Sequence, residues 1–138
     1  MTQEESNVAI LKGAYDAWHE TKGDSNVWMD ILADEIAFGS AADGRPGLDF
    51  TKARASKQEV AEYFEGLKQD WEMEFYHINE FVAQGERVVA LAEVSWINRQ
   101  TGKPLRMPKA DVWMLKDGKV TQFMEFYDSQ PAIEATQN

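Results

Sequence analysis

Apolar residues recur at helical spacing in the first half of the chain. A stripe of them over residues 3–21 predicts a first helix, and a shorter helical segment is predicted over residues 25–32. Ser56 with Glu59 three residues later is a capping-box pattern, which predicts that a further helix begins there. Between these helices, residues 36–40 have the pattern of a short strand. Residues 41–55, rich in glycine, proline and polar residues, are predicted to form a long loop at the mouth of a site.

The second half changes to strand-like alternation. Residues 73–82, 87–97 and a final hairpin over 108–128 alternate between apolar and polar positions, with turn signals between them. Helices followed by a meander of four antiparallel strands are typical of an α+β domain. We therefore expect one domain over residues 1–138, with the chain after Gln130 only loosely held.

Three charged residues, Lys109, Asp111 and Glu125, interrupt the apolar alternation of the final hairpin. A two-residue loop at Asp117-Gly118 would place Asp111 and Glu125 on opposite faces of the sheet. A three-residue loop with Gly118 in a bulge would gather all three charges on one face, leave the other face nearly all apolar, and set Lys109 opposite Glu125. We favour the bulged loop because it separates charged from apolar residues.

In this register, the face with the three charges consists of Lys109, Asp111, Trp113, Thr121, Phe123, Glu125 and Tyr127. The opposite face would be Ala110, Val112, Met114, Val120, Gln122, Met124 and Phe126. Two coverings of that apolar face stay open from the pattern alone. Either the helices cover it, or a second copy of the chain does, as a homodimer formed through the sheet.

Composition narrows the classes of function. With 43% apolar and 28% charged residues, the chain is an ordinary globular domain. Its net charge of −10 disfavours nucleic-acid and anionic-membrane surfaces, and the absence of cysteine excludes disulfides and thiolate chemistry. Two well-separated histidines form no metal motif, so we expect no metal and no cofactor. No signal-peptide pattern or apolar run of spanning length is visible, and we expect a cytoplasmic protein.

The order of these elements, together with three stretches of sequence, resembles SnoaL-like and ketosteroid-isomerase-like proteins of the nuclear-transport-factor-2-like superfamily. The stretches are residues 32–38, 81–88 and 111–128. The resemblance implies a cone-shaped α+β fold, also described as a cystatin-like α+β barrel, with a curved antiparallel sheet and N-terminal helices packed on one face. It also implies a cavity for a small apolar organic ligand, and homodimers formed through the outer face of the sheet.

The resemblance also suggests catalytic residues. Tyr15 and Asp111 match the hydrogen-bond donors of ketosteroid isomerases, and Glu125 matches the working carboxylate of SnoaL-type cyclases. Ser40 stands where the isomerases carry their aspartate base, which argues against steroid isomerisation by that mechanism. The arginine-x-aspartate pair of limonene-epoxide hydrolases is missing from residues 89–95.

Glu125 is the first candidate for a general acid/base, because apolar neighbours disfavour the charged form of a carboxylate. A plain Lys109–Glu125 ion pair at a wet rim is the alternative, as simple pairing with Lys109 is for Asp111 and core packing is for Tyr15. The residues expected to contact a substrate are Lys109, His77, Trp28, Trp113, Phe123, Tyr127 and Ser40. His77 could equally be an ordinary rim histidine, and the aromatic residues plain core.

Three functions remain in view. The first is a cofactor-independent isomerase or cyclase that moves a proton on an apolar carbonyl or polyketide-like compound. The second is a non-catalytic ligand-binding or dimerisation module of the same fold. The third is an epoxide hydrolase-like enzyme, weakened by the missing arginine and aspartate.

Overall fold

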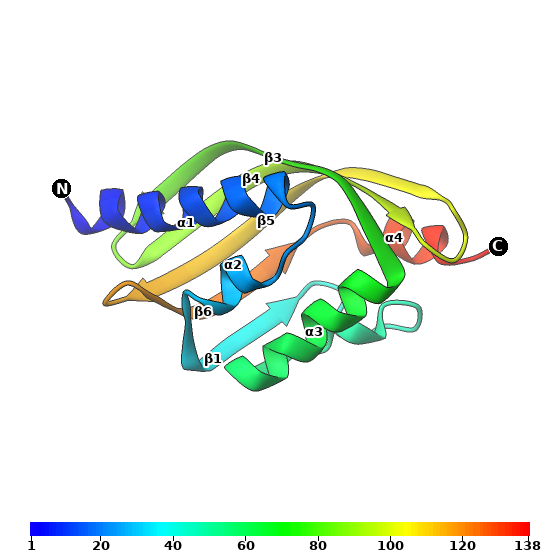
Figure 1. Ribbon diagram of the computed structural model, residues 1–138, viewed down its shortest axis with the longest axis horizontal. Coiled ribbons are helices and arrows are strands. Elements are labelled where there is room, and N and C mark those ends of the chain that lie inside the picture. The colour runs from blue at the N-terminus through cyan, green and yellow to red at the C-terminus, as the bar shows by residue number, and fades with distance from the viewer.

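Four helices and one six-stranded sheet make up the chain, which the computed structural model describes over all of residues 1–138 (Figure 1). The helices are α1 (Gln3–Glu20), α2 (Asn26–Met29), α3 (Lys57–Asp70) and α4 (Ser129–Ala135), with a 3₁₀ turn η1 (Asp49–Thr51). The strands are β1 (Leu32–Ser40), β2 (Arg54–Ser56), β3 (Trp71–Gln84), β4 (Arg87–Asn98), β5 (Pro104–Lys116) and β6 (Lys119–Phe126).

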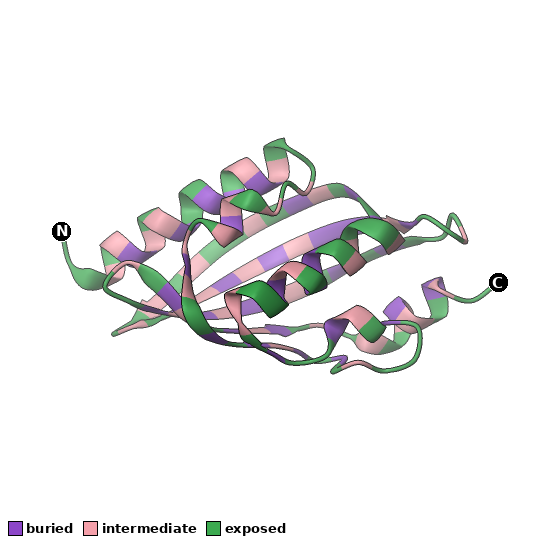
Figure 2. Ribbon diagram, turned by 60° about the horizontal axis from the view of Figure 1, so that its bottom comes forward, coloured by how far each residue is buried: buried purple, intermediate pink, exposed green.

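The strands lie in the order β2–β1–β6–β5–β4–β3, and the sheet curls around the helices (Figure 2). α1 packs mainly against β3, and α3 against β1 and β2. This confirms the predicted α+β fold with helices on one face. The sheet differs from the expected one in being mixed, because β1 runs parallel to β6. It also stays open, since the edge strands β2 and β3 do not pair with each other.

Both long helices begin at side-chain caps. The hydroxyl of Ser56 accepts a hydrogen bond from the backbone N–H of Glu59 at 3.1 Å, so α3 begins where the sequence predicted. The carboxylate of Glu59 closes the motif on the N–H of Ala55 rather than on that of Ser56. α1 begins at a complete capping box formed by Thr2 and Glu5.

The loop of the final hairpin differs from the predicted three-residue loop. Asp117 and Gly118 have φ angles of 51° and 78°, and Lys116 pairs with Lys119, which is the two-residue type I′ geometry. A β-bulge lies farther along β6, where Thr121 has no partner between the pairs that Val120 and Gln122 make. The extra residue places Asp111 and Glu125 on the same face, which a two-residue loop followed by a regular ladder would have separated.

Because of the bulge, two residues differ in position from the predicted division of the two faces. Val120 is fully buried opposite Leu115, instead of lying on the outer face, and Thr121 is displaced from the inner face. Asp111, rather than Lys109, lies directly opposite Glu125. The predicted gathering of the charged residues on one face is otherwise confirmed.

The predicted loosely held tail is wrong, because residues 129–135 form helix α4. The carboxylate of Asp128 caps this helix, Ala132 and Ala135 are buried, and Thr101 donates a hydrogen bond to the carbonyl of Ala135 at 2.6 Å. The second helix is shorter than predicted, and β1 already begins at Leu32. The long loop over 41–55 contains η1 and the start of β2.

The middle of the outer face of the sheet is apolar, and no helix covers this face. Because α1 and α3 both lie on the inner face (Figure 2), the first of the two coverings considered above does not occur. Phe126 is 49% exposed and Val82 51% exposed, both unusual values for large apolar side chains. No helix has the length and apolar character needed to cross a bilayer.

Candidate functional site

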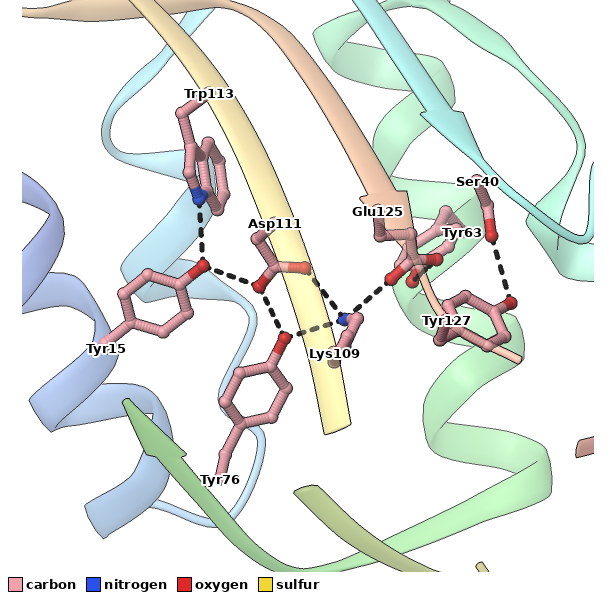
Figure 3. A network of polar contacts seen from close by, with 9 residues as sticks. All are labelled: Tyr15, Ser40, Tyr63, Tyr76, Lys109, Asp111, Trp113, Glu125 and Tyr127. Carbon is pink, nitrogen blue, oxygen red and sulfur yellow. Dashed lines mark hydrogen bonds and ion pairs between the residues drawn. The ribbon is translucent and has the colours of Figure 1, made fainter. Parts of the chain in front are cut away.

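The charged residues of the final hairpin lie on the inner face of the sheet, beneath the helices (Figure 3). Asp111 is 1% exposed and Glu125 is 3% exposed. The Nζ atom of Lys109 lies 2.7 Å from Oε1 of Glu125 and 3.2 Å from Oδ1 of Asp111. One buried ammonium therefore bridges two buried carboxylates, and one negative charge is left over when both acids are ionised.

Two tyrosines donate hydrogen bonds to Asp111. The hydroxyl of Tyr15, on α1, lies 2.6 Å from Oδ2, and that of Tyr76, on β3, lies 2.6 Å from the same atom. Each hydroxyl also accepts a bond, from Trp113 Nε1 at 2.8 Å and from Lys109 Nζ at 2.6 Å respectively. The two phenolic hydrogens must therefore point at Asp111, as they would toward a carboxylate.

A different tyrosine orients Glu125. Tyr63 on α3 donates a hydrogen bond from its hydroxyl to Oε2 of Glu125 at 2.7 Å. Beside it, the hydroxyl of Tyr127 lies 3.0 Å from Oγ of Ser40, and either can be the donor. Ser40 pairs with Glu125 in the β1–β6 ladder, which brings the serine of the first strand to the end of the last.

The protonation of the network follows from burial and charge. Burial lowers the pKa of Lys109, but the carboxylates of Asp111 and Glu125 outweigh burial and hold that pKa well above its usual value. Burial, reinforced by the neighbouring carboxylates, raises the pKa values of Tyr15, Tyr63 and Tyr76 well above their usual range. Lys109 is thus an ammonium ion and the three tyrosines are neutral donors, which leaves no amine nucleophile for Schiff-base chemistry.

This network forms one wall of a cavity of about 80 Å³ between the helices and the sheet. Of the 20 residues that line the cavity, 17 are hydrophobic. They include all five tryptophans of the chain: Trp18, Trp28, Trp71, Trp96 and Trp113. Leu48 and Phe50 of the 41–55 loop and Ala132 of α4 also line it, so the loop predicted at the mouth of a site and the tail predicted to be loosely held both contribute to its wall.

The structure brings most of the predicted site residues together. Lys109, Asp111, Glu125, Trp28, Trp113, Phe123 and Tyr127 line the cavity, while Tyr15 and Ser40 bond to residues of its wall. His77 does not reach the site. It is exposed on β3, with its ring 4.9 Å from the ring of His19 and 4.7 Å from that of Phe75.

Two residues of the network, Tyr63 and Tyr76, were not predicted. Tyr63 is adjacent to the apolar stripe of α3, one residue before Phe64, and Tyr76 is adjacent to His77 on β3. A buried carboxylate needs hydrogen-bond donors. Tyrosines on the elements that face Asp111 and Glu125 were therefore the signal in the sequence that could have identified Tyr63 and Tyr76. No group of three or more histidine, aspartate or glutamate side chains is gathered closely enough to hold a metal ion.

Comparison with known protein families identifies the family of this chain. The sequence profile of the SnoaL-like domain matches residues 11–123, which is most of the chain. The chain belongs to the SnoaL-like domain family. No curated protein shows significant similarity to it over its sequence.

Several solved structures share the fold. An NTF2-like protein of unknown function from Burkholderia pseudomallei is 19% identical with a TM-score of 0.86, and all of both chains is covered. A candidate SnoaL-like polyketide cyclase from Mesorhizobium loti is 16% identical, with a TM-score of 0.74 and coverage of 92% of this chain and 100% of that one. A protein of ketosteroid isomerase-like fold from Catenulispora acidiphila, in complex with trimethylamine, is 12% identical, with a TM-score of 0.74 and coverage of 92% and 91%. At these identities the likeness shows the fold of this SnoaL-like domain, and its function must come from the site.

Proposed function

We propose that this SnoaL-like protein binds a small, largely apolar organic molecule in the aromatic cavity, and that Glu125 exchanges a proton with it. The observation that carries the proposal is the position of Glu125. Its carboxylate is buried in the cavity wall and accepts one hydrogen bond from Tyr63 and one ion-pair contact from Lys109. A carboxylate has about four lone-pair positions, so roughly half remain for a ligand.

The surroundings of Glu125 suit an acid/base. Tyr63 and Lys109 fix the carboxylate from two sides, which orients its free lone pairs before a ligand enters. A carboxylate held in this way at a cavity wall can take a proton from a ligand and return it, as general acid/base catalysis requires.

Tyr127 is the group we assign to a substrate oxygen. It lines the cavity two residues after Glu125, and Ser40 can donate to it, which would leave the phenolic hydrogen free for a carbonyl. Tyr15 and Asp111, which the family resemblance suggested as donors to the substrate, are engaged with each other. We assign Asp111 and Tyr15 to holding the network in place.

The same geometry ranks the other reactions lower. At the position where a ketosteroid isomerase needs its base, Ser40 bonds to Tyr127 and carries no charge. The inner face of β4 offers no arginine or aspartate for epoxide hydrolysis, because its buried positions there are Val88, Ala90, Ala92 and Val94. Non-catalytic binding remains the second candidate, because the charged network satisfies its own donors without any ligand.

Proton exchange tests the proposal directly. Small enolisable ketones with an apolar body would be incubated with the protein in D₂O, and deuterium uptake at the α carbon followed by NMR. Binding would be followed through tryptophan fluorescence, since all five tryptophans line the cavity. Glu125→Gln should keep binding and reduce exchange by about 10²- to 10⁴-fold.

Glu80→Gln is the matched control, because Glu80 is an exposed glutamate of β3 and should leave both readings unchanged. Binding without exchange in the unaltered protein would favour the non-catalytic module. Exchange that survives Glu125→Gln would remove Glu125 from the mechanism.

We also propose that two copies of the chain associate through the outer face of the sheet. That face carries an uninterrupted apolar group: Val89, Leu91, Ala110, Val112, Met114, Met124 and Phe126. Val112 is at its centre, paired with Val89 on one side and Met124 on the other. Light scattering should show a dimer that Val112→Glu converts to a monomer and that Gln84→Glu, at the exposed end of β3, leaves intact. A monomer in the unaltered protein would contradict the proposal.

A further inference from the structure

Each donor group of the charged network has a partner within the network. The Nζ atom of Lys109 donates to the hydroxyl of Tyr76 at 2.6 Å and pairs by charge with Glu125 at 2.7 Å and Asp111 at 3.2 Å. The hydroxyls of the three tyrosines and the indole N–H of Trp113 likewise point at partners within the network. A ligand that needs a donor from this network would have to displace one of these contacts.

Acceptor capacity, in contrast, is left over. Oδ1 of Asp111 is buried and accepts no hydrogen bond, because Lys109 at 3.2 Å pairs with it by charge outside hydrogen-bond geometry. Each oxygen of Glu125 has one partner where about two can be accommodated. An unsatisfied buried carboxylate oxygen at a cavity wall is costly, and a donating ligand relieves that cost.

The net charge of the network also favours a cationic ligand. One ammonium between two ionised carboxylates leaves one excess negative charge beside a cavity with mostly apolar walls. An anionic ligand would add to that charge, a neutral one would leave it, and a monocation would cancel it. The tryptophans in the wall add to this preference, since the indole ring is the best aromatic partner for a cation.

We infer that the ligand presents a positively charged, hydrogen-bond-donating nitrogen to the Asp111–Glu125 end of the cavity. The ligand class is a primary or secondary ammonium compound with an apolar, preferably aromatic, body. This inference rests on the proposed binding function and specifies the charge of the molecule bound. Tyr127 remains available to an oxygen elsewhere on the same ligand.

Five small aromatic probe ligands separate the effect of ligand charge from the effect of hydrogen-bond donation by the ligand. Benzylammonium has both, benzyl alcohol donates without charge, phenyltrimethylammonium is charged without donating, tert-butylbenzene has neither, and benzoate carries the opposite charge. Binding would be measured by tryptophan fluorescence and by calorimetry at one pH and one salt concentration. Benzylammonium should bind at least about tenfold more tightly than benzyl alcohol, with benzoate weakest.

Glu125→Gln removes the excess charge, so it should cut the preference for benzylammonium over benzyl alcohol to about twofold or less, whereas Glu80→Gln should leave it intact. If benzyl alcohol, tert-butylbenzene or benzoate binds as tightly as benzylammonium, the inference about charge is overturned while ligand binding in the cavity stands. If no probe of any charge binds, the proposed binding function is contradicted together with the inference. The probe comparison needs only the unaltered protein, so it decides the question even where a variant fails to fold.

Discussion

Replacing Asp111 by asparagine should destabilise the protein much more than replacing Glu125 by glutamine. Both substitutions remove one carboxylate from the same buried network and keep the shape of the side chain. The difference comes from what surrounds each group. Asp111 receives two tyrosine hydroxyls and pairs with Lys109, whereas Glu125 receives only Tyr63 and Lys109.

An asparagine at 111 cannot satisfy these neighbours in either orientation. With its amide nitrogen toward the tyrosines, the hydroxyls of Tyr15 and Tyr76 lose their acceptor, and their oxygens are already engaged by Trp113 and Lys109. With the nitrogen toward Lys109, two donors face each other. Removing one partner of a buried ion pair costs about 3–5 kcal/mol, and we expect a loss in that range.

A glutamine at 125 leaves fewer groups without partners. Its amide oxygen can accept from Lys109, and its amide nitrogen can donate to the oxygen of Tyr63, which accepts no other bond in the network, so only the hydroxyl hydrogen of Tyr63 loses its acceptor. The substitution also removes the excess negative charge. We expect the free energy of unfolding to change by no more than about 1 kcal/mol.

Urea unfolding followed by circular dichroism measures both variants, with Glu80→Gln as an exposed control. In thermal unfolding, a domain of this length shifts its Tm by about 3 °C per kcal/mol, so Asp111→Asn should melt roughly 10–15 °C lower. Equal losses for the two variants, or a larger one for Glu125→Gln, would refute the reasoning. Glu125 would then be a structural ion-pair partner of Lys109 rather than a group free to react.

Three further predictions concern the supports of the site. Tyr63→Phe should cost about 1 kcal/mol in urea unfolding and should slow any Glu125-dependent proton exchange, because Glu125 loses a hydrogen bond. Ser56→Ala should lower the free energy of unfolding by about 1 kcal/mol through loss of the α3 cap, measured the same way. Nδ1 of His19 accepts the backbone N–H of Tyr76, and burial and nearby cations lower the pKa of His19. Because the unfolded state then binds the proton more readily, stability should fall as the pH drops below about 6.5, and His19→Gln should flatten that part of the unfolding profile.

The helices and the alternating strands could be read from the sequence because each depends on local periodicity. α1 and α3 have long apolar stripes and side-chain caps; α1 lies within a residue of its predicted limits, and α3 begins at its predicted cap. α4 was missed because its seven residues are too few for a repeating stripe. Its stability comes from the burial of Ala132 and Ala135 against other elements, which local sequence does not reveal.

The candidate site could be predicted only in part, and β3 shows why. The ladder between β3 and β4 shifts register twice, between Met73 and Phe75 and between Ile78 and Glu80. Met73 and Tyr76 are therefore both buried although they are three residues apart, and His77 is exposed. Strict alternation cannot be carried across a bulge, so the sequence left the direction of His77 open and gave no reason to single out Tyr76.

The single bulge at Thr121 decides whether this protein has a site at all. The Asp117-Gly118 loop pairs Lys116 with Lys119, and a regular ladder from that pair would turn Glu125 toward the outer face. The unpaired residue adds one position to β6 and so places Glu125 opposite Asp111, within reach of Tyr63. The apolar outer face and the charged inner face are two consequences of this one irregularity. A change that moved the bulge would therefore put a charge into the proposed dimer surface at the same time as it removed the acid from the cavity.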